Sequence, residues 1–399
     1  YNWLRVVLPK VTLSDAQAQA GMRLRWTRNL MHNLIEEFYI SFNDLIEFRL
    51  DNYHLDFWTA FTVPASKRVG YNNMIGNFAE VNNPTAVGAA APGPDFDPAL
   101  RGIVLPEVAL NLPLPHAHTR DSGIALPTAA LPYNEMKLGF CFRDWDRLLI
   151  LDNTGIGVVD PDTVDGVALG HSRCAKASDL LDNQRKRMGG TPRDILIEQV
   201  QTLSPQTFNP ADNKAYDIRM SHAIKALFWG VRNKTSACEW SNYTAASPDA
   251  YADGSESGVV FNTNLAADPI NKVSISYENS TRISLMESDY FSLVMPFYHA
   301  VSIPEETGYH MYSYALDILS VDPMGSTNYG KLTNVSICVE SSEAARTAAG
   351  APPATATLAE RSKNAADGHH VAQKYDFVLT AVNHNVVRIS GGALGFPVL

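Results

Sequence analysis

His116 and His118, separated by one residue, have the spacing that points most directly to chemistry. On an extended segment, side chains at i and i+2 point to the same face, so the two imidazoles would form half of a metal site. No third ligand lies nearby in the sequence. We therefore interpret the pair as polar residues at a strand edge or a subunit contact. We expect no bound metal, and we expect replacement of both residues by Phe to leave folding intact.

Two further patterns resemble parts of active sites. Asp121-Ser122-Gly123 lies close to His118, which supplies the residue types of nucleophilic catalysis, but the chain has no Gly-x-Ser-x-Gly elbow. We interpret Arg120 and Asp121 as a hydrogen-bonded structural corner. The glycine-rich residues 391–395 follow a predicted strand, yet no helix follows them to offer its N-terminus to a phosphate. The sequence therefore predicts no catalytic residue, no cofactor-binding residue and no cofactor.

The cysteines and glycosylation motifs give no site either. The four cysteines are far apart and contain no Cys-x-x-Cys pair, which excludes a familiar zinc ribbon and gives no disulfide framework. They are Cys141, Cys174, Cys238 and Cys338. Four Asn-x-Ser/Thr motifs occur in polar segments, and we interpret them as unglycosylated. They begin at Asn233, Asn242, Asn279 and Asn334.

Composition and charge exclude several classes of protein. Apolar residues make up 45% of the 399 residues and charged residues 19%, which is typical of a folded chain long enough for two domains. No apolar run approaches the roughly 20 residues of a membrane-spanning helix. The net charge of -10 argues against direct binding of nucleic acid, which depends on clustered Lys and Arg. The compact basic run Arg185-Lys186-Arg187 is interpreted as a solvated loop.

Alternating apolar residues predict more strands than helices. The predicted strands are 1–8, 137–143 (half-buried), 195–200, 335–339 and 375–382, the last with apolar residues on both faces. One helix is predicted over 51–60, with Asp51 as its N-cap.

Three stretches have the composition of long surface loops, and a fourth marks a boundary. The predicted loops are 79–100, 245–270 and 341–369. The polar segment 177–193 ends in Gly189-Gly190-Thr191-Pro192 and is the expected boundary between two strand-rich halves of similar length.

Several long motifs in this sequence resemble the major capsid proteins of nucleocytoplasmic large DNA viruses, and most closely the iridovirus branch. The first half carries RWTRNLMHNLIEE at 25–37, KRVGYNNMIGN at 67–77 and TRDSGIALPTAALPYNEMKL at 119–138. The second half carries SHAIKALFW at 221–229, YENSTR at 277–282, YHMYSYALD at 309–317, GSTNYGKLTNVS at 325–336 and NHNVVRISGGALGFPVL at 383–399. The resemblance covers essentially the whole chain in the same order.

The resemblance implies an all-β double jelly roll, meaning two tandem eight-stranded antiparallel β-sandwiches with small helical insertions. Residues 1–180 would form the N-terminal jelly roll and residues 190–399 the C-terminal one. It also implies a structural protein without enzymatic activity. Three chains would form a trimer whose six jelly rolls approximate a hexagon, and these capsomers would tile the icosahedral shell of a large double-stranded DNA virus.

The expected partners follow from the same resemblance. They are two further copies in a homotrimer, neighbouring capsomers, minor capsid and penton proteins, and internal viral membrane proteins, with no direct contact to nucleic acid. The expected location is the virion shell, assembled in the cytoplasm of the infected host cell.

Two departures from the family pattern stand out. The chain has no initiator Met and opens directly in a predicted strand, so we expect its first segment to be missing. The family usually has bulky aromatic residues where this chain has His116-Ala117-His118.

Two other functions are compatible with strand-rich composition and exposed loops. A lectin-like or receptor-binding sandwich would show one concave polar pocket with aromatic walls, whereas a capsid tile would present broad lateral interfaces. A jelly-roll enzyme of the cupin kind would need His and Glu ligands clustered inside one sandwich, and the 11 histidines show no such motif.

Overall fold

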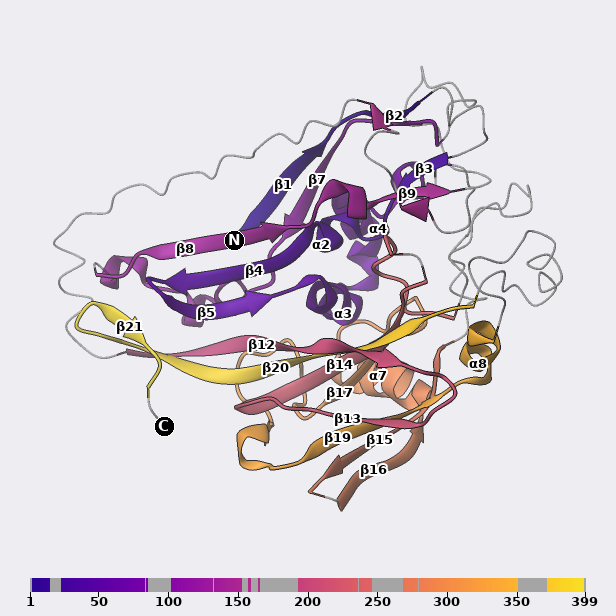
Figure 1. The fold of residues 1–399 in the computed structure, drawn as a ribbon. Coiled ribbons are helices and arrows are strands. Elements are labelled where there is room, and N and C mark those ends of the chain that lie inside the picture. The colour runs from indigo at the N-terminus through magenta and orange to yellow at the C-terminus, as the bar shows by residue number, and fades with distance from the viewer. Residues whose placement is uncertain are drawn as a thin grey trace.

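The structure is a computed structural model of the 399-residue chain. It describes residues 2–14, 23–82, 84, 102–131, 133–152, 157–158, 164–165, 193–235, 237–245, 268–278, 280–350 and 372–397. Two groups of antiparallel sheets are stacked on one another, the first from the N-terminal half of the chain and the second from the C-terminal half (Figure 1).

The C-terminal half forms a sandwich of two sheets. One sheet has the order β12 (Arg193–Phe208), β20 (Tyr375–Ser390), β14 (Ala223–Asn233) and β17 (His310–Ser313). The other has the order β13 (Lys214–Asp217), β19 (Val335–Ser341), β15 (Ile270–Tyr277) and β16 (Ser280–Glu287). Among these eight strands, each step along the chain moves to the opposite sheet except at the β15–β16 hairpin, which is the connectivity of a jelly roll.

Short strands extend the first of these two sheets. They are β18 (Thr327–Asn328), which pairs with β14, and β21 (Ala393–Gly395), which pairs with β20. Side chains from both sheets meet in one apolar cluster that includes Trp229, Ile275, Ile337 and Phe377.

In the part of the N-terminal half that the structure describes, the strands form four smaller sheets. They are β1 (Trp3–Leu8) with β7 (Val108–Pro113); β5 (Leu45–Leu50), β4 (Ile35–Phe42) and β8 (Met136–Phe142); β10 (Gly157–Val158), β9 (Leu149–Asp152) and β3 (Arg23–Trp26); and β11 (Val164–Asp165), β2 (Val11–Leu13) and β6 (Val104–Leu105). Among the described residues, several of these strands have only two to four residues, and the sheets are less continuous than those of the C-terminal half.

Helices are short and lie beside or between the sheets. The α-helices are α2 (Leu30–Leu34), α3 (Asn52–Thr62), α4 (Ala65–Ile75), α5 (Ala79–Asn82), α7 (Met295–His299) and α8 (Glu343–Ala349), and a π-helical turn, η7 (Tyr290–Val294), leads into α7. Among the described residues, no helix combines the length and the apolar character needed to cross a bilayer.

Helix α3 lies between the two groups of sheets (Figure 1). The Asp51 side chain accepts a hydrogen bond of 2.8 Å from the His54 backbone N–H, so the predicted N-cap is confirmed. Leu55 packs in the core of the N-terminal half, whereas Phe57 and Phe61 pack against strands β14 and β20. The sequence predicts one apolar stripe, but both faces of this helix are buried.

The predicted strands at 1–8, 195–200, 335–339 and 375–382 are confirmed as β1, β12, β19 and β20. Strand β20 is buried on both faces, as predicted, because it lies in the middle of its sheet with α3 behind it. Strand β8 forms at 136–142, but its predicted half-burial is wrong. It is an edge strand, and Leu138 and Phe142 are 41% and 47% exposed.

The loop predictions are partly wrong and partly outside the described residues. Residues 79–82 form α5. Residues 343–349 form α8, and the Ser342 hydroxyl caps this helix by accepting a 3.2 Å hydrogen bond from the Ala345 N–H. Of the predicted boundary at 177–193, all but Arg193 lies outside the described residues, as do the basic run at 185–187 and most of the three loops.

Gly308 and Gly391 give a matched pair for testing the packing between segments. Both have positive φ, 98° and 61°, but a Cβ on Gly308 would lie 2.0 Å from the Tyr243 carbonyl oxygen, whereas nothing lies within 4 Å at Gly391. We expect Gly308→Ala to lower the melting temperature severely or to prevent folding. Gly391→Ala should cost only the ~1–2 kcal/mol of a left-handed backbone. Equal melting temperatures for the two variants would contradict this account.

Candidate functional site

The two histidines singled out in the sequence do not lie on a strand. His116 precedes a short 3-10 turn at Ala117–Thr119, and the two rings meet edge to face with centroids 6.0 Å apart. His118 is held on both nitrogens, by Glu47 Oε1 at 2.9 Å and the Ile124 carbonyl at 2.7 Å. His116 Nε2 lies 3.2 Å from the Asn2 amide. The prediction of a strand edge is therefore wrong.

The expectation that two Phe residues would be tolerated here also needs correction. Glu47 is buried, and burial of an unpaired carboxylate is costly, so His118 is needed as its partner. Burial lowers the pKa of His118, but the hydrogen bond and the charge of Glu47 outweigh this effect, and the net pKa lies above its ordinary value. Burial lowers the pKa of His116 to about 4.

The other candidates have structural roles. The Asp121 carboxylate accepts a 2.7 Å hydrogen bond from the Gly123 N–H, and Arg120 pairs with Glu198, which confirms the predicted corner. Gly391 and Gly392 form the turn between β20 and β21. No group of three or more His, Cys, Asp or Glu side chains suited to a metal occurs among the residues the structure describes.

Two of the glycosylation motifs are used inside the fold. The Asn233 and Asn242 side chains are buried, and each accepts a hydrogen bond from the hydroxyl two residues later, at 2.6 Å from Thr235 and 2.8 Å from Thr244. A glycan on either buried amide is incompatible with this packing. Asn334 is exposed, and Asn279 lies outside the described part of the chain.

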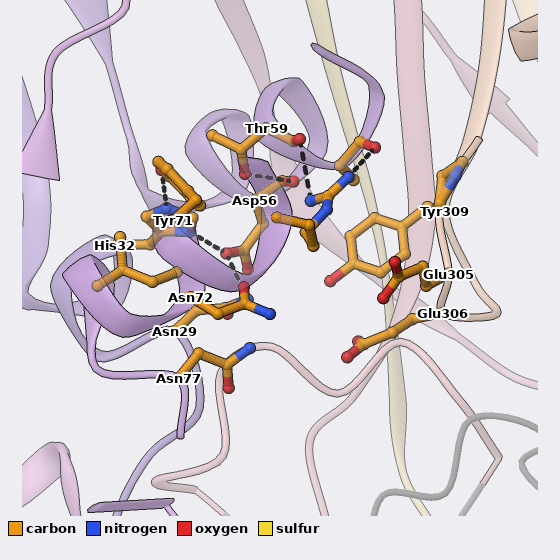
Figure 2. A pocket seen from close by; sticks show the side chains of 14 residues that line it. Asn29, His32, Asp56, Thr59, Tyr71, Asn72, Asn77, Glu305, Glu306 and Tyr309 are labelled. Atoms are coloured by element: carbon orange, nitrogen blue, oxygen red, sulfur yellow. Dashed lines mark hydrogen bonds and ion pairs between the residues drawn. The ribbon is translucent and has the colours of Figure 1, made fainter. Parts of the chain in front are cut away.

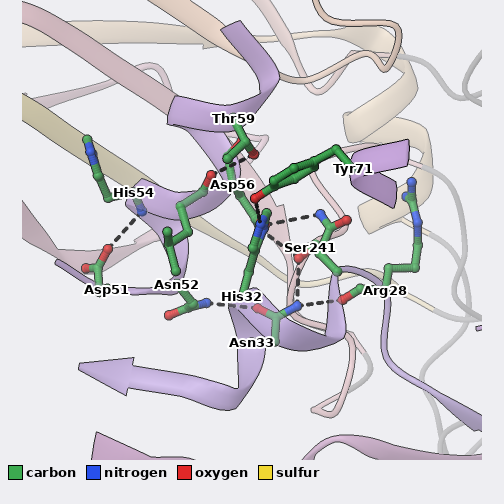
Figure 3. Close-up of polar contacts among 12 residues, drawn as sticks. Arg28, His32, Asn33, Asp51, Asn52, His54, Asp56, Thr59, Tyr71 and Ser241 are labelled. Carbon is green, nitrogen blue, oxygen red and sulfur yellow. Dashed lines mark hydrogen bonds and ion pairs between the residues drawn. The ribbon is translucent and has the colours of Figure 1, made fainter. Parts of the chain in front are cut away.

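The strongest polar feature, which sequence patterns missed, joins the two halves around Asp56 on α3 (Figure 3). One carboxylate oxygen accepts hydrogen bonds from the Asn29 amide at 3.1 Å and His32 Nδ1 at 2.6 Å. The other accepts from the hydroxyls of Ser241 at 2.6 Å and Tyr243 at 3.0 Å. Asp56 is buried, and its partners come from residues up to 187 positions away.

Further contacts extend this network on both sides. His32 Nε2 lies 2.7 Å from the Tyr71 hydroxyl on α4. The Asn33 side-chain amide donates 2.7 Å hydrogen bonds to Ser241 Oγ and to the Arg28 carbonyl. Its oxygen, Oδ1, accepts a 3.1 Å hydrogen bond from the Asn52 amide. Burial, followed by the nearby Asp56 charge, raises the pKa of Tyr243 well above its ordinary value, so this hydroxyl stays protonated and serves as a donor.

A small cavity of about 50 Å³ lies beside this network (Figure 2). Its walls come from α3, α4 and the segment at 304–309 of the C-terminal half, where Glu305, Glu306 and Tyr309 face the cavity (Figure 2). A space of this size accommodates a few water molecules and is far smaller than the pockets that hold substrates. The lectin-like and cupin-like hypotheses gain no support from it.

A second set of buried charges holds the same interface. Glu198 on β12 accepts from Lys225 Nζ on β14 at 2.6 Å and pairs on its other oxygen with Arg120 from the N-terminal half. The Arg120 guanidinium also lies over the Trp58 ring, 5.0 Å from its centroid. Lys225 is further anchored by the Ser320 carbonyl. Each buried charge therefore has a partner of opposite sign, which burial of an ion requires.

The third contact is a stack of two arginines around one indole. The guanidinium carbons of Arg143 and Arg232 lie 3.5 and 4.0 Å from the Trp240 ring centroid. Arg143 comes from the end of the β8 segment and Arg232 from β14, so the ring of Trp240 is clamped between the two halves. Arg25 of β3 adds an ion pair of 3.0 Å to the buried Glu239.

This arrangement is suited to structure and not to catalysis. All four acceptor positions of the Asp56 carboxylate are used, so it has no free oxygen with which to act as a base. The sequence offered one weak signal of this network, namely two polar residues, His32 and Asn33, inside the otherwise apolar run at 30–35. Their distant partners have no such pattern.

The fold defines a class of protein. Comparison with solved structures gives a TM-score of 0.66 to the PBCV-1 virus capsid, at 16% identity over 100% of this chain and 90% of that one. A second comparison, with the Faustovirus major capsid protein, gives 0.58 at 12% identity over 97% and 77%. The chain therefore has the double jelly-roll fold.

Sequence comparisons then give the family. The model for the major capsid protein N-terminus matches residues 2–179, and the model for the large eukaryotic DNA virus major capsid protein matches residues 184–395. The major capsid protein of Costelytra zealandica iridescent virus is 52% identical over 100% of this chain and 83% of its own length. That of lymphocystis disease virus 1 is 43% identical over 100% and 83%. This chain belongs to the family of large eukaryotic DNA virus major capsid proteins, which are structural components of the capsid and not enzymes.

Removal of the Asp56 carboxylate tests the network. We expect Asp56→Ala to destabilise the fold by about 3–5 kcal/mol, because it leaves four buried donors without an acceptor. The matched control is Asp194→Ala, which breaks an exposed pair with Arg388 and should barely change the melting temperature. Urea or thermal unfolding followed by circular dichroism measures both. An Asp56→Ala variant as stable as the control would refute the role given to this residue.

Acid should weaken the interface through the buried imidazole of His54. Burial, followed by the charge of Arg120, lowers the pKa of His54 to about 3, so between pH 6.5 and 3 the unfolded chain binds a proton that the folded chain does not. Stability should fall by about 1.4 kcal/mol for each pH unit below 6.5. His54→Phe, which keeps the stacking on Trp58, should flatten the loss of melting temperature between pH 7 and 5. The control is His222→Asn, at an exposed position, which should leave the dependence of melting temperature on pH unchanged. The same pH dependence in His54→Phe as in the wild type would contradict this account.

Proposed function

We propose that this chain forms homotrimeric, pseudo-hexagonal capsomers that tile the icosahedral shell of a large double-stranded DNA virus. The observation that carries the proposal is that the similarity to capsid proteins spans both halves of the chain, with 100% of the chain covered in sequence and in structure. Two jelly rolls in each of three chains give six similar blocks around a threefold axis, which is how a trimer approximates a hexagon.

The junction around Asp56 supports this proposal mechanically. A tile must keep its two blocks in one orientation, and this junction uses directional hydrogen bonds and paired charges instead of apolar contact alone. We divide the chain into an N-terminal jelly roll at 1–180 and a C-terminal one at 190–399. The core of the N-terminal block also includes Ile195, Ile197 and Leu394. The division therefore applies to the sequence, and side-chain packing continues across it.

The partners and location follow from a shell role. The proposed contacts are with two other copies, neighbouring capsomers, minor capsid and penton proteins, and internal viral membrane proteins. Direct contact with nucleic acid is not part of the proposal, since the chain carries a net charge of -10. We propose assembly in the cytoplasm of the infected host cell. No catalytic, cofactor-binding or metal-binding residue is assigned.

Oligomeric mass tests this proposal directly. We expect the chain to elute at three times its mass of 43.8 kDa in size-exclusion chromatography with light scattering at micromolar concentration. Because obligate interfaces bury large areas, dilution to the nanomolar range should leave the trimer intact. A stable monomer or dimer at every concentration and salt tested would refute the trimeric capsomer.

A further inference from the structure

Exposed apolar side chains concentrate on one region of the C-terminal half. A continuous helical segment, η7 followed by α7, and the loops beside it carry eight large apolar residues that are at least one third exposed. We call this surface the helical platform, and it consists of Leu293, Val294, Phe297, Tyr298, Val301, Ile303, Leu316 and Met324. Phe297 and Tyr298 are 69% and 71% exposed, the largest aromatic surfaces in it.

The platform is rigid, because its base is firmly held. On the opposite face of the helix, Phe291 is buried in the core of the sandwich and Met295 in the apolar cluster around α3, and both fix the orientation of the helix. The π-turn at Tyr290–Val294 accommodates Pro296, whose ring nitrogen has no hydrogen to continue a regular α-helical ladder. Backbone hydrogen bonds tie the following loops to the helix, including Ile318 N–H to the His299 carbonyl at 3.1 Å.

The loop at 316–324 is tied to the same helix. His299 Nδ1 donates to the Leu316 carbonyl at 3.1 Å, and the Leu316 N–H donates to the Met324 carbonyl at 3.4 Å. Ser302 is anchored to α3 through the Phe61 carbonyl at 3.1 Å. The platform residues are therefore neighbours in space as well as in sequence, and they are held before any partner arrives.

The size of the platform indicates a protein partner. A fully exposed large apolar side chain has roughly 200 Å² of accessible surface. The eight residues are each about half exposed, so together they leave on the order of 800 Å² of apolar surface open to solvent. A monomer rarely exposes a contiguous patch above a few hundred Å². A standard protein interface buries about 800 Å² on each partner. The platform alone therefore has the area of one side of a stable interface.

A ring of three copies needs two different mating surfaces on each chain, because a threefold interface is heterologous. Strand β1 in the N-terminal half offers the second surface. It pairs on one side with β7, and its alternating residues Trp3, Arg5 and Val7 are all exposed, with Trp3 at 65%. Trp and Arg are the residue types that most often dominate binding energy at interfaces.

Charge favours the same pairing. Asp289, Asp317 and Asp322 are exposed on the elements that carry the platform, whereas the β1 stripe carries the cation Arg5 between its two apolar residues. Contact between two platforms would bring like charges together, while contact between the platform and β1 places a cation beside carboxylates.

We propose that the helical platform of one copy docks on the Trp3–Arg5–Val7 stripe of β1 in the next copy, head to tail. The proposal specifies the partner surface of the trimer proposed above and rests on it for the symmetry alone. Apolar area supplies the affinity, and the acidic rim with Arg5 sets the orientation.

Single substitutions at each surface test the two halves of the proposal. In the full 399-residue chain, Tyr298→Asp and Trp3→Asp should each convert the trimer to monomer at micromolar concentration in light scattering. The matched control is Tyr133→Asp, which removes a tyrosine of similar exposure, 75%, outside both surfaces, and should remain a trimer. Circular dichroism and melting temperature establish that each variant is folded. A second platform variant, Phe297→Ser, covers the case in which Tyr298→Asp fails to fold.

Mixing the two variants tests the head-to-tail geometry. Tyr298→Asp retains an intact stripe and Trp3→Asp retains an intact platform, so one good interface remains between them and a one-to-one heterodimer should form. If platforms met each other, Trp3→Asp would self-associate and Tyr298→Asp would stay monomeric in the mixture, which would overturn the pairing. Folded platform variants that remain trimeric would overturn the platform assignment. The alternative partner of an exposed apolar surface is a membrane, so platform variants that remain trimeric but no longer bind anionic phospholipid vesicles would also overturn it. A wild-type chain that is never trimeric would instead refute the proposed function.

Discussion

The fold depends on satisfying one buried carboxylate. Asp56 sits on a helix that is buried on both faces, between two groups of sheets, where an ionised carboxylate without partners would be prohibitively costly. The chain meets this requirement with donors from both halves, Asn29 and His32 from one and Ser241 and Tyr243 from the other. The four hydrogen bonds are directional, so they form together only when the halves have one relative position. We interpret the buried charge as a device for fixing orientation more than for adding stability.

Sequence patterns predicted the parts of this fold that depend on near neighbours. The alternation at 195–200, 335–339 and 375–382 identified β12, β19 and β20, because a strand covered on one or both faces leaves its period in the sequence. Asp51 was predictable as a helix cap because its acceptor and the His54 N–H are three residues apart. The ordered resemblance to capsid proteins supplied what periodicity could not, which is the tandem double jelly roll.

The sequence could not predict features that depend on distant residues. Strand β8 has the alternation of a half-buried strand, but its position at the edge of a sheet leaves Leu138 and Phe142 exposed, and no local pattern encodes an edge. His118 looked like a removable polar residue because its partner, Glu47, is 71 positions away. The Asp56 network has the same property, since its donors Ser241 and Tyr243 lie in a segment with no periodic pattern.

The interior and the surface divide two physical tasks that a shell protein must combine. Its shape must be fixed before assembly, and buried hydrogen bonds do this because misplacing one donor costs more than the bond itself contributes. Its contacts with other copies must form from separate molecules, and apolar area suits this step because it tolerates small errors in approach. An exposed apolar surface also invites aggregation. The net charge of -10 opposes that outcome by mutual repulsion, so association is confined to positions where apolar complementarity outweighs it.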